Sequence, residues 1–530
     1  MKRYIISILS AVLLTGITSC VGDLDTEPLN DRITTANQVF KDPASYKEFL
    51  AKLYGSMTLT GQRGEYGMPE ISAPDEGTTS FMRTYWSLQE ISTDECISAW
   101  GDPGLVELHG HNWSEQNFYN QLLYQRVFIN IMFCNEYIRV VPPKIESLPA
   151  SMHEEVKRYV EEARFLRAFF YSVAIDLWGN VPFVTEQDAP GGFLPKQISR
   201  AALFEYIESE LLDIIPGLAE PGENEYARAD QAAAWMLLAK LYLNAEVYLG
   251  PGNKRYTECA EYCNKIISSG VYSLNDSYRN LFLADNHTLR NEIIFPIAED
   301  GNSGRNYGGV TFIIHAAVGG AENPEADFGI NFGWSGNRFT NTFADKFADK
   351  TGDTDSRALF YTNGQTLDIS NPTQFTEGYL STKFKNKTSA GVNGVNAIFV
   401  DTDFPLFRYA DVYLMYAEAQ LRGAAGTDAN TALEYINEIR ERAYGDGSGN
   451  ITSDELTLDF ILDERARELH WEAQRRTDLI RFGKFTGGSY LWDWKGNIKS
   501  GVATPAHLYV YPLPATDLAV NTNLDQNDDY

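Results

Sequence analysis

Residues 229–250 read ADQAAAWMLLAKLYLNAEVYLG, and this stretch decides the fold class. Its apolar residues recur at spacings of three and four, which is the pattern of an amphipathic helix. A second helical pattern covers residues 256–267, and the turn-forming GPGN at 250–253 separates the two. Small alanines beside tyrosines between helices are typical of tetratricopeptide packing. The stretch therefore predicts a helical hairpin of the kind that builds helical repeats.

The same pattern recurs towards the C-terminus. Residues 406–443 carry two more helical stripes, with the turn sequence GAAGTD at 423–428 between them. Because helix follows helix without βαβ alternation, the sequence predicts a mainly α fold: a tetratricopeptide-like helical-repeat scaffold with minor β elements. The helical-repeat regions are expected at about 115–270 and 404–485, and an ordinary helical bundle is the alternative. Further long helices are predicted at about 43–58, 115–141, 153–178, 201–217 and 455–482.

Two regions differ in kind from the helical ones. Residues 60–114 and 285–400 are rich in Gly, Asn, Asp, Thr and aromatic residues and show few helical stripes. Irregular segments this long are usually functional or disordered, and their many aromatic residues argue against disorder. We therefore expect long, structured loops there, and the binding chemistry with them.

The N-terminus has the pattern of a secretory signal. Lys2 and Arg3 precede an apolar stretch that is too short to span a bilayer, and Thr-Ser-Cys follows at 18–20. Small residues before a cysteine resemble the lipobox of bacterial lipoproteins, so Cys20 is the expected lipidation site, and an ordinary cleavage site near a cysteine is the alternative. The predicted domains are a signal peptide at 1–19, a lipidated tether at 20–40 and a single body at 41–530.

Composition narrows the possible partners and cofactors. The chain has 44% hydrophobic and 13% aromatic residues, which is too apolar for a disordered protein. Lys and Arg number 44 against 72 Asp and Glu, and the net charge of −28 excludes nucleic acid as the main partner. No cofactor is expected, although the Asp-rich loops leave a structural Ca²⁺ open. Small buried thiols are expected at Cys96, Cys134, Cys259 and Cys263.

A search for a reaction centre selects none. The sequence has no Gly-x-Ser-x-Gly elbow, no phosphate-binding Gly-x-x-x-x-Gly-Lys loop and no Gly-x-Gly-x-x-Gly turn. His153 and Glu154 begin a zinc-protease motif, but Lys157 stands where the second histidine is needed. Carboxylate pairs such as glycosidases use occur by chance among so many acids, so a secreted glycoside hydrolase stays an alternative.

Sugar binding matches the loop composition better. Sugar rings stack on aromatic side chains, and their hydroxyls bind acids, amides and arginine. The first loop region offers Asp75, Arg83 and Trp100, and the second offers RNYGG at 305–309 and GWS at 333–335. The alternative is that these aromatic residues fill a loop-rich core.

Two long segments carry a resemblance to a known family. EARFLRA at 162–168 runs on to LWGNVP at 177–182, and ERAREL at 464–469 is followed by EAQRRTDLIRFG at 472–483. In order and spacing they resemble the SusD/RagB family of outer-membrane nutrient-binding lipoproteins, over essentially the whole chain. The resemblance implies a glycan site built from loops on one face and a TonB-dependent transporter bound on another. We interpret the Arg- and Glu-rich segments as ion pairs that pin helices.

Within the family, the chain is most similar to the starch-binding member. That similarity implies an aromatic arc of Tyr307 and Trp334 that follows a curved α-glucan, with Asp75 and Arg83 on its hydroxyls. The segments that carry it are DEG at 75–77, TDEC at 93–96, RNYGG at 305–309, GWS at 333–335, DTD at 401–403 and YLWDWKG at 490–496.

The chain departs from that member at two positions. Ser98 stands in place of a third stacking tryptophan, and Pro103 stands in place of a contacting asparagine. Trp100, two residues after Ser98, either replaces the missing ring or belongs to the core.

The resemblance implies a non-catalytic, lipid-anchored protein exposed at the cell outer membrane. It is expected to capture starch or malto-oligosaccharide and to deliver it to a SusC-like TonB-dependent transporter. A different glycan or a peptide on the same scaffold is the alternative cargo.

Overall fold

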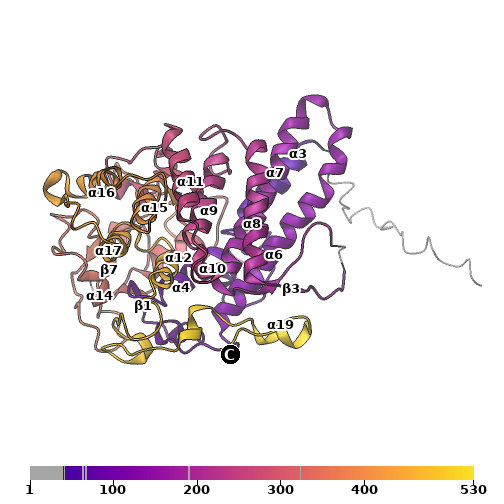
Figure 1. Cartoon of the computed structure of the whole chain (residues 1–530). Helices are drawn as coiled ribbons and strands as arrows, with labels where there is room; N and C mark the ends of the chain where they lie inside the picture. The colour runs from indigo at the N-terminus through magenta and orange to yellow at the C-terminus, as the bar shows by residue number, and fades with distance from the viewer. Residues whose placement is uncertain are drawn as a thin grey trace, which may run out of the picture. The chain divides into compact units, whose positions relative to one another are not determined.

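The structure is a computed structural model that describes residues 40, 42–62, 65, 68–188, 191–320, 322 and 324–530 (Figure 1). The chain divides into two compact units, Met1–Tyr46 and Lys47–Tyr530, and the second carries everything discussed below. The predicted signal peptide, the lipidation site at Cys20 and nearly all of the tether lie outside the described residues.

The scaffold is a row of helices in which each packs on the next. In Figure 1 the row runs from α6 and α7 through α9 and α11 to α15 and α16. The helices α9, α11, α15 and α16 form the two predicted hairpins, so the mainly α helical-repeat fold is confirmed. The main helices of the row are α6 (Phe118–Val140), α7 (His153–Leu177), α8 (Arg200–Ile214), α9 (Gln231–Leu243), α11 (Tyr256–Ser268), α15 (Tyr409–Leu421) and α16 (Ala429–Tyr444).

Local sequence explains where these helices begin. The Asp230 side chain accepts a hydrogen bond from the Ala233 backbone N–H at the start of α9, and Asp428 does the same for Thr431 in α16. Such N-caps satisfy a backbone donor that the helix leaves free. Ala232, Ala239 and Ala260 are fully or almost fully buried between the helices, as their small size predicted.

The regions at 60–114 and 285–400, predicted as long structured loops with few helical stripes, also contain helices. The first contains helix α4 (Phe81–Glu90) and the second contains helix α12 (Gly309–Ala316). Both helices are short and almost entirely buried, with nine of the ten residues of α4 and all eight of α12 covered by protein.

The predicted helix at 455–482 is broken into α17 (Leu458–Leu469) and α18 (Arg475–Arg481). Trp471 and Ala473, which lie between them, have positive φ angles of 61° and 57°, so the chain cannot continue as a right-handed helix there. The predicted helix at 229–250 also divides, into α9 and the short α10 (Ala245–Leu249).

Within the described residues, the named strands form four two-stranded antiparallel pairs. One pair joins the two loop regions, because β1 (Cys96–Ser98) binds β5 (Asn337–Phe339) with Ile97 opposite Arg338. The ladder extends by a hydrogen bond from the Ala99 N–H to the Gly336 carbonyl oxygen at 2.8 Å. It therefore brings the segment before Trp100 beside the segment after Trp334. The other pairs are β2 (Val181–Pro182) with β3 (Gln197–Ile198), β4 (Ile293–Ile297) with β8 (Phe404–Arg408), and β6 (Phe360–Tyr361) with β7 (Leu380–Ser381).

Short helical elements complete the description. They are α3 (Ala44–Gly55), α5 (Val106–Gly110), α13 (Glu325–Phe328), α14 (Asn341–Ala344) and α19 (Ala515–Val520), with 3₁₀ turns η1 (Glu76–Thr79), η2 (Pro142–Ser147), η3 (Ala150–Met152), η4 (Ile215–Gly217), η5 (Arg279–Phe282), η6 (Asn286–Thr288), η7 (Gly447–Gly449), η8 (Lys495–Asn497) and η9 (Ala506–Tyr509). None of the helices in the described part of the chain is both long and apolar enough to cross a bilayer. The four cysteines of the body are free and buried, as predicted.

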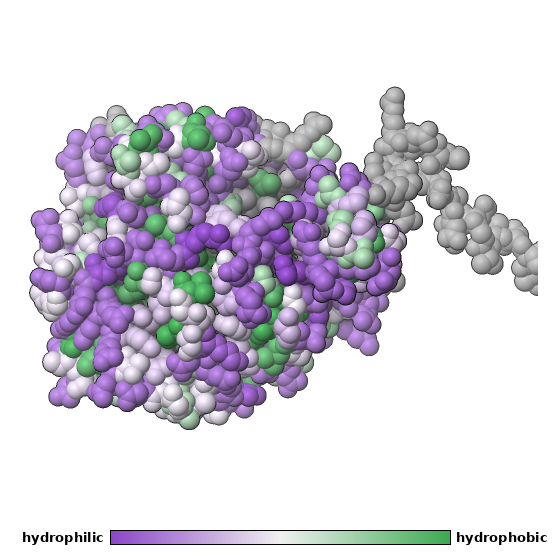
Figure 2. All heavy atoms as spheres, turned by 90° about the horizontal axis from the view of Figure 1, so that it is seen from above, coloured by the Kyte–Doolittle hydropathy of each residue, from purple (hydrophilic) through white to green (hydrophobic). Residues whose placement is uncertain are grey.

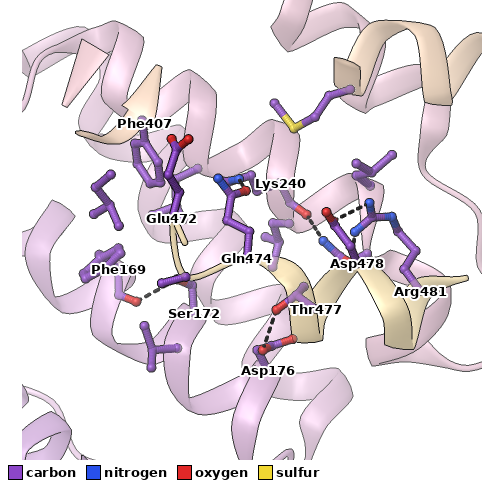
Figure 3. Close-up of a pocket in the computed structure, with 18 of the residues that line it drawn as sticks. Phe169, Ser172, Asp176, Lys240, Phe407, Glu472, Gln474, Thr477, Asp478 and Arg481 are labelled. Atoms are coloured by element: carbon purple, nitrogen blue, oxygen red, sulfur yellow. Dashed lines mark hydrogen bonds and ion pairs between the residues drawn. The ribbon is translucent and has the colours of Figure 1, made fainter. Parts of the chain in front are cut away.

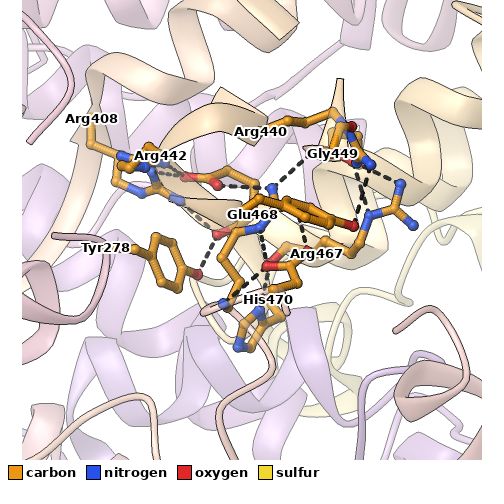
Figure 4. Close-up of polar contacts among 12 residues, drawn as sticks. Tyr278, Arg408, Arg440, Arg442, Gly449, Arg467, Glu468 and His470 are labelled. Carbon is orange, nitrogen blue, oxygen red and sulfur yellow. Dashed lines mark hydrogen bonds and ion pairs between the residues drawn. The ribbon is translucent and has the colours of Figure 1, made fainter. Parts of the chain in front are cut away.

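The Arg- and Glu-rich segments form buried ion pairs, as we interpreted them. Glu468 on α17 lies among arginines from β8, α16 and a turn: it pairs with Arg408 at 2.6 Å and with Arg442 (Figure 4), and also with Arg357 at 3.2 Å. Burial raises the pKa of a carboxyl group, but these three guanidinium groups outweigh it and hold the pKa of Glu468 well below its usual range. The network ties β8, α16 and α17 together.

Candidate functional site

The five predicted site residues lie around one open pocket of about 520 Å³. Asp75 caps the start of η1 and Arg83 lies in α4, while Trp100 follows β1, Tyr307 precedes α12 and Trp334 precedes β5. The structure thus brings together residues that are more than 200 positions apart in the chain. The pocket is lined by Asp75, Glu76, Arg83, Trp100, Asp102, Tyr307, Phe332 and Trp334.

An ion pair forms the polar edge of the pocket. The Arg83 Nη1 lies 2.9 Å from the Asp75 Oδ2, and the Arg83 side chain is only 7% exposed whereas that of Asp75 is 54% exposed. The guanidinium lies over the Phe312 ring at 4.8 Å and donates to the Tyr307 carbonyl oxygen at 3.4 Å. Arg83 is therefore fixed by the Phe312 ring and the Tyr307 carbonyl oxygen. The Asp75 carboxylate faces solvent, where it can accept hydrogen bonds from hydroxyl groups.

Close backbone packing positions Tyr307. A Cβ atom at Gly77 would lie 2.7 Å from the Tyr307 carbonyl oxygen, and one at Gly308 would lie 2.2 Å from the Ser80 Cβ. Only glycine fits at either place. The Tyr307 ring meets the Phe399 ring edge-on, with centroids 5.1 Å apart, and stays half-buried in the pocket wall.

A buried carboxyl group lies beneath the Tyr307 loop. The Glu299 Oε1 accepts hydrogen bonds from the Val310 N–H at 3.0 Å and from the Thr58 hydroxyl at 2.9 Å. Gly309 has a φ of +58°, and a Cβ there would lie 2.0 Å from the same oxygen. Burial raises the pKa of Glu299 to about 8, so this side chain is largely protonated at neutral pH.

Trp334 is positioned by the end of α12. The Trp334 N–H donates to the His315 carbonyl oxygen at 2.7 Å, and the Gly336 N–H donates to that of Ala316 at 2.9 Å. The buried His315 imidazole stacks on the Trp334 ring with centroids 4.9 Å apart and an interplanar angle of 26°. Burial lowers the pKa of His315.

Trp100 both lines the pocket and supports Trp334. Its indole N–H donates to the Trp334 carbonyl oxygen at 3.0 Å, and a Cβ at Gly336 would lie 2.6 Å from its ring. Trp100 is half-buried. One part of the ring therefore packs as core does, while another part faces the pocket.

Ser98 and Pro103, the two positions at which the chain departs from the starch-binding member, do not line the pocket. Ser98 is 2% exposed and pairs with Asn337 in the β1–β5 ladder. Pro103 is exposed but is not among the lining residues.

Sequence reasoning missed three lining residues, Glu76, Asp102 and Phe332. The clearest signal was available for Phe332, which precedes Trp334 by two residues in an extended, glycine-containing segment. Alternate residues of an extended chain point to the same side.

Two further cavities contain none of the predicted site residues. A small cavity of about 90 Å³ lies between α7, α9 and α18 (Figure 3). Its walls are joined by contacts such as Thr477 Oγ1 to Asp176 Oδ2 at 2.9 Å and Arg481 Nη2 to Asp478 Oδ1 at 2.8 Å. A larger apolar pocket of about 770 Å³ beside α6 and α19 contains none of the predicted site residues.

The face shown in Figure 2 is mostly hydrophilic, with hydrophobic residues in small separate groups. No group of three or more His, Cys, Asp or Glu residues within the described ranges is placed to hold a metal ion.

Comparison with known proteins assigns the fold and the family. Residues 280–530 match the model of the SusD family. Over its whole length the chain is 34% identical to the starch-binding protein SusD of Bacteroides thetaiotaomicron, of which the alignment covers 99%. The chain belongs to the SusD family. It is also 24% identical to the SusD-like protein P38 of Formosa agariphila, over 91% of this chain and 92% of the relative.

Solved structures of the SusD family share this fold. The surface glycan-binding protein A of B. thetaiotaomicron, determined in complex with laminarihexaose, superposes with a TM-score of 0.67. It is 20% identical, and the match covers 92% of this chain and 99% of that one. These relatives are named as binding proteins and not as enzymes, in agreement with the expectation of a non-catalytic protein.

Proposed function

We propose that the protein is a non-catalytic glycan-binding lipoprotein that captures starch-like α-glucans in the pocket around Tyr307 and Trp334. The observation that supports this most is the convergence of two inclined aromatic rings and an exposed acid held by arginine. The ring centroids of Tyr307 and Trp334 are 6.3 Å apart and their planes are inclined by 46°. Inclined rings suit a chain that turns from one sugar to the next.

The binding energy is expected to come from few contacts. A sugar that binds an open pocket must displace well-bound water, so the dissociation constant should lie between about tens of micromolar and millimolar. Aromatic contacts contribute on the order of 1 kcal/mol each beyond their buried area. Loss of one ring should therefore weaken binding at least about tenfold.

Calorimetric titration of the purified protein with maltoheptaose and with cellohexaose tests the proposal. The curved α-linked chain should bind, and the flat β-linked chain should bind more weakly. Trp334→Ala should weaken maltoheptaose binding about tenfold or more. Trp494→Ala is the matched control, because Trp494 is half-buried and also donates its indole N–H to a carbonyl oxygen, that of Ile369 at 2.9 Å, but lies outside the pocket. Equal affinities for the two sugars, or none for either, would refute the α-glucan assignment.

A different glycan is the second candidate cargo. A structural relative was determined in complex with laminarihexaose, which is a different glucan from starch. A panel of amylopectin, dextran, inulin, xylan and mannan on native gels separates the candidates, because only the cognate polysaccharide retards the protein. A hydrolase would release reducing ends in the same samples.

We also propose that the protein is lipid-anchored at the outer membrane and hands oligosaccharides to a TonB-dependent transporter. The lipobox-like N-terminus and the family membership support this. Co-purification of the transporter from detergent-solubilised outer membranes tests it, and its absence from such preparations would count against the partnership.

A further inference from the structure

The pocket beside α6 and α19, of about 770 Å³, shares no residue with the glycan pocket. It lies in the lower right of Figure 1, where α6 and α19 come together. Single exposed apolar residues are normal on a protein surface, but several around one hollow mark an interaction site. Four exposed, large apolar side chains line this pocket: Met132, Phe193, Leu194 and Val520, at 54%, 45%, 43% and 68%.

Hydrogen bonds from side chains to the backbone join the walls of this pocket. The Asn521 Nδ2 donates to the Pro195 carbonyl oxygen at 2.8 Å, which ties the segment after α19 to the segment before β3. The Asn135 Nδ2 of α6 donates to the Val184 carbonyl oxygen at 3.1 Å, which ties α6 to the segment after β2. The fold itself therefore builds the pocket, and a ligand does not have to order its walls.

Two carboxylates in the pocket lining lack a cation. Asp188 and Asp517 are both half-buried, and neither is paired with a lysine, an arginine or a histidine among the described residues. Arg139 also lines the pocket, but its Nη1 already lies 2.5 Å from the Glu136 Oε2. A carboxylate in apolar surroundings is costly without a partner. A cation carried by a ligand would supply that partner.

The Tyr124 hydroxyl is a third polar group of the lining without a partner. Tyr124 is 2% exposed, and its hydroxyl makes no hydrogen bond to any residue that the structure describes. Burial and, to a smaller extent, the charge of Asp517 raise the pKa of Tyr124, so the hydroxyl keeps its proton and can donate it. A buried hydroxyl left unsatisfied costs stability, and a carbonyl oxygen of a ligand would satisfy it.

These groups together call for a ligand with an apolar body, a positive charge and a carbonyl oxygen, which a peptide supplies. We propose that the pocket is a second binding site, for a segment of a partner protein in which leucine-like side chains lie beside lysine or arginine. The apolar side chains cover Phe193 and Val520, the basic side chain pairs with Asp517, and a peptide carbonyl oxygen accepts from Tyr124. An anionic lipid surface is disfavoured, because the unpaired charges of the pocket are negative. The proposal does not depend on which glycan the other pocket binds.

Calorimetric titration of the purified protein with synthetic peptides tests the proposal. The probe is the acetylated and amidated hexapeptide Leu-Lys-Leu-Leu-Lys-Leu. In one control peptide glutamate replaces each lysine, and in the other serine replaces each leucine. The probe should bind at least about tenfold more tightly than either control. The serine peptide keeps the positive charge, so it measures attraction to the net charge of −28 alone.

Variants of the lining locate the binding. Val520→Ser should weaken binding of the probe about threefold to fivefold, and Asp517→Asn about fivefold. Val392→Ser and Asp454→Asn are the matched controls, because Val392 is 62% exposed, Asp454 is an exposed aspartate, and both lie outside the pocket. Tyr124→Phe should weaken the probe about threefold and raise the urea midpoint of the free protein, since it removes an unsatisfied hydroxyl.

Equal affinities for the three peptides, or wild-type affinity in both Val520→Ser and Asp517→Asn, would overturn the proposal. So would an equal loss in the two control variants. A dimer in sedimentation velocity that Val520→Ser dissociates would assign the pocket to a second copy instead. Binding to phosphatidylcholine vesicles that Val520→Ser abolishes would assign it to a lipid surface. Maltoheptaose affinity should be unchanged in every lining variant, because the two pockets share no residue. Circular dichroism should show an unchanged fold.

Discussion

Replacement of Glu299 by glutamine should make the stability of the protein less dependent on pH. Glu299 is 9% exposed, and its Oε1 accepts hydrogen bonds from Thr58 and Val310. Burial and, to a smaller extent, the neighbouring Asp403 raise its pKa to about 8. A glutamine keeps the accepting oxygen and the shape of the side chain, but it cannot ionise.

Whether stability rises or falls with pH depends on how many protons the folded and the unfolded protein bind. Between the pKa of an unfolded glutamate, about 4.3, and the folded value near 8, the folded protein holds a proton that the unfolded chain has released. Stability contributed by this group is therefore fully present below pH 4.3 and is lost as the pH rises towards 8. The loss is about 1.4 kcal/mol per pH unit, or roughly 3–4 kcal/mol between pH 5 and pH 8.

Urea unfolding of the wild type and Glu299→Gln at pH 5, 6, 7 and 8 measures this difference. The free energy of unfolding of the wild type should fall relative to that of the variant by the amount above. Glu205→Gln is the control, since Glu205 is an exposed glutamate on α8 and should leave the pH profile unchanged. A difference between wild type and Glu299→Gln that stays constant from pH 5 to pH 8 would refute a protonated Glu299.

Three further predictions concern Trp100 in the pocket wall, the buried ion pairs of Glu468 and the lipid anchor at Cys20. Trp100→Ala should lower the urea midpoint as well as maltoheptaose affinity, because Trp100 holds the segment around Trp334; Trp100→Phe, which removes the hydrogen bond and part of the ring, should cost at least about 1 kcal/mol of stability, and a loss of affinity without any loss of stability would instead make Trp100 a pure binding ring. Glu468→Gln should cost about 3–5 kcal/mol in urea unfolding, because it leaves buried arginines uncompensated, while calorimetry of the folded variant should show unchanged glycan affinity. Cys20→Ala should release the protein from the membrane fraction, and a variant that stays membrane-bound and acylated would contradict lipidation at Cys20.

The hairpin helices could be predicted from the sequence because they are long. Helix α9 has 13 residues, and the spacing of Ala232, Leu238 and Ala239 along it depends only on local sequence. Helices α4 and α12 have ten and eight residues and lie within segments rich in Gly, Asn, Asp and Thr, so they were not separated from the loops around them.

The site could be predicted only through the resemblance to a family. Composition placed aromatic residues in the loops but did not decide between ligand and core. The pairing of β1 with β5 brings Trp100 to Trp334, and no local pattern gives a contact between residues so far apart in sequence. Phe332 was missed although its place two residues before Trp334 was a signal, because only the fold shows that its ring is exposed at the pocket.

The Arg-rich segment after α17 also reaches the binding face indirectly. Arg475 binds the Asp94 carboxylate at 2.7 Å, the Trp471 N–H donates to Glu95 at 3.0 Å, and the Trp86 indole N–H donates to the Trp471 carbonyl oxygen at 3.0 Å.

These contacts hold α4 and β1 in place. Residues within or next to these two elements line the pocket. Arg83 lies in α4, and Trp100 follows β1 by two residues. Each contact is made to a backbone atom, an acid or a core tryptophan, and none is made to a ring that lines the pocket. A change at an exposed pocket residue such as Phe332 therefore leaves these supporting contacts intact. For this reason a scaffold with the family signature can present a different set of stacking rings, and the cargo has to be determined from the pocket rather than from the signature.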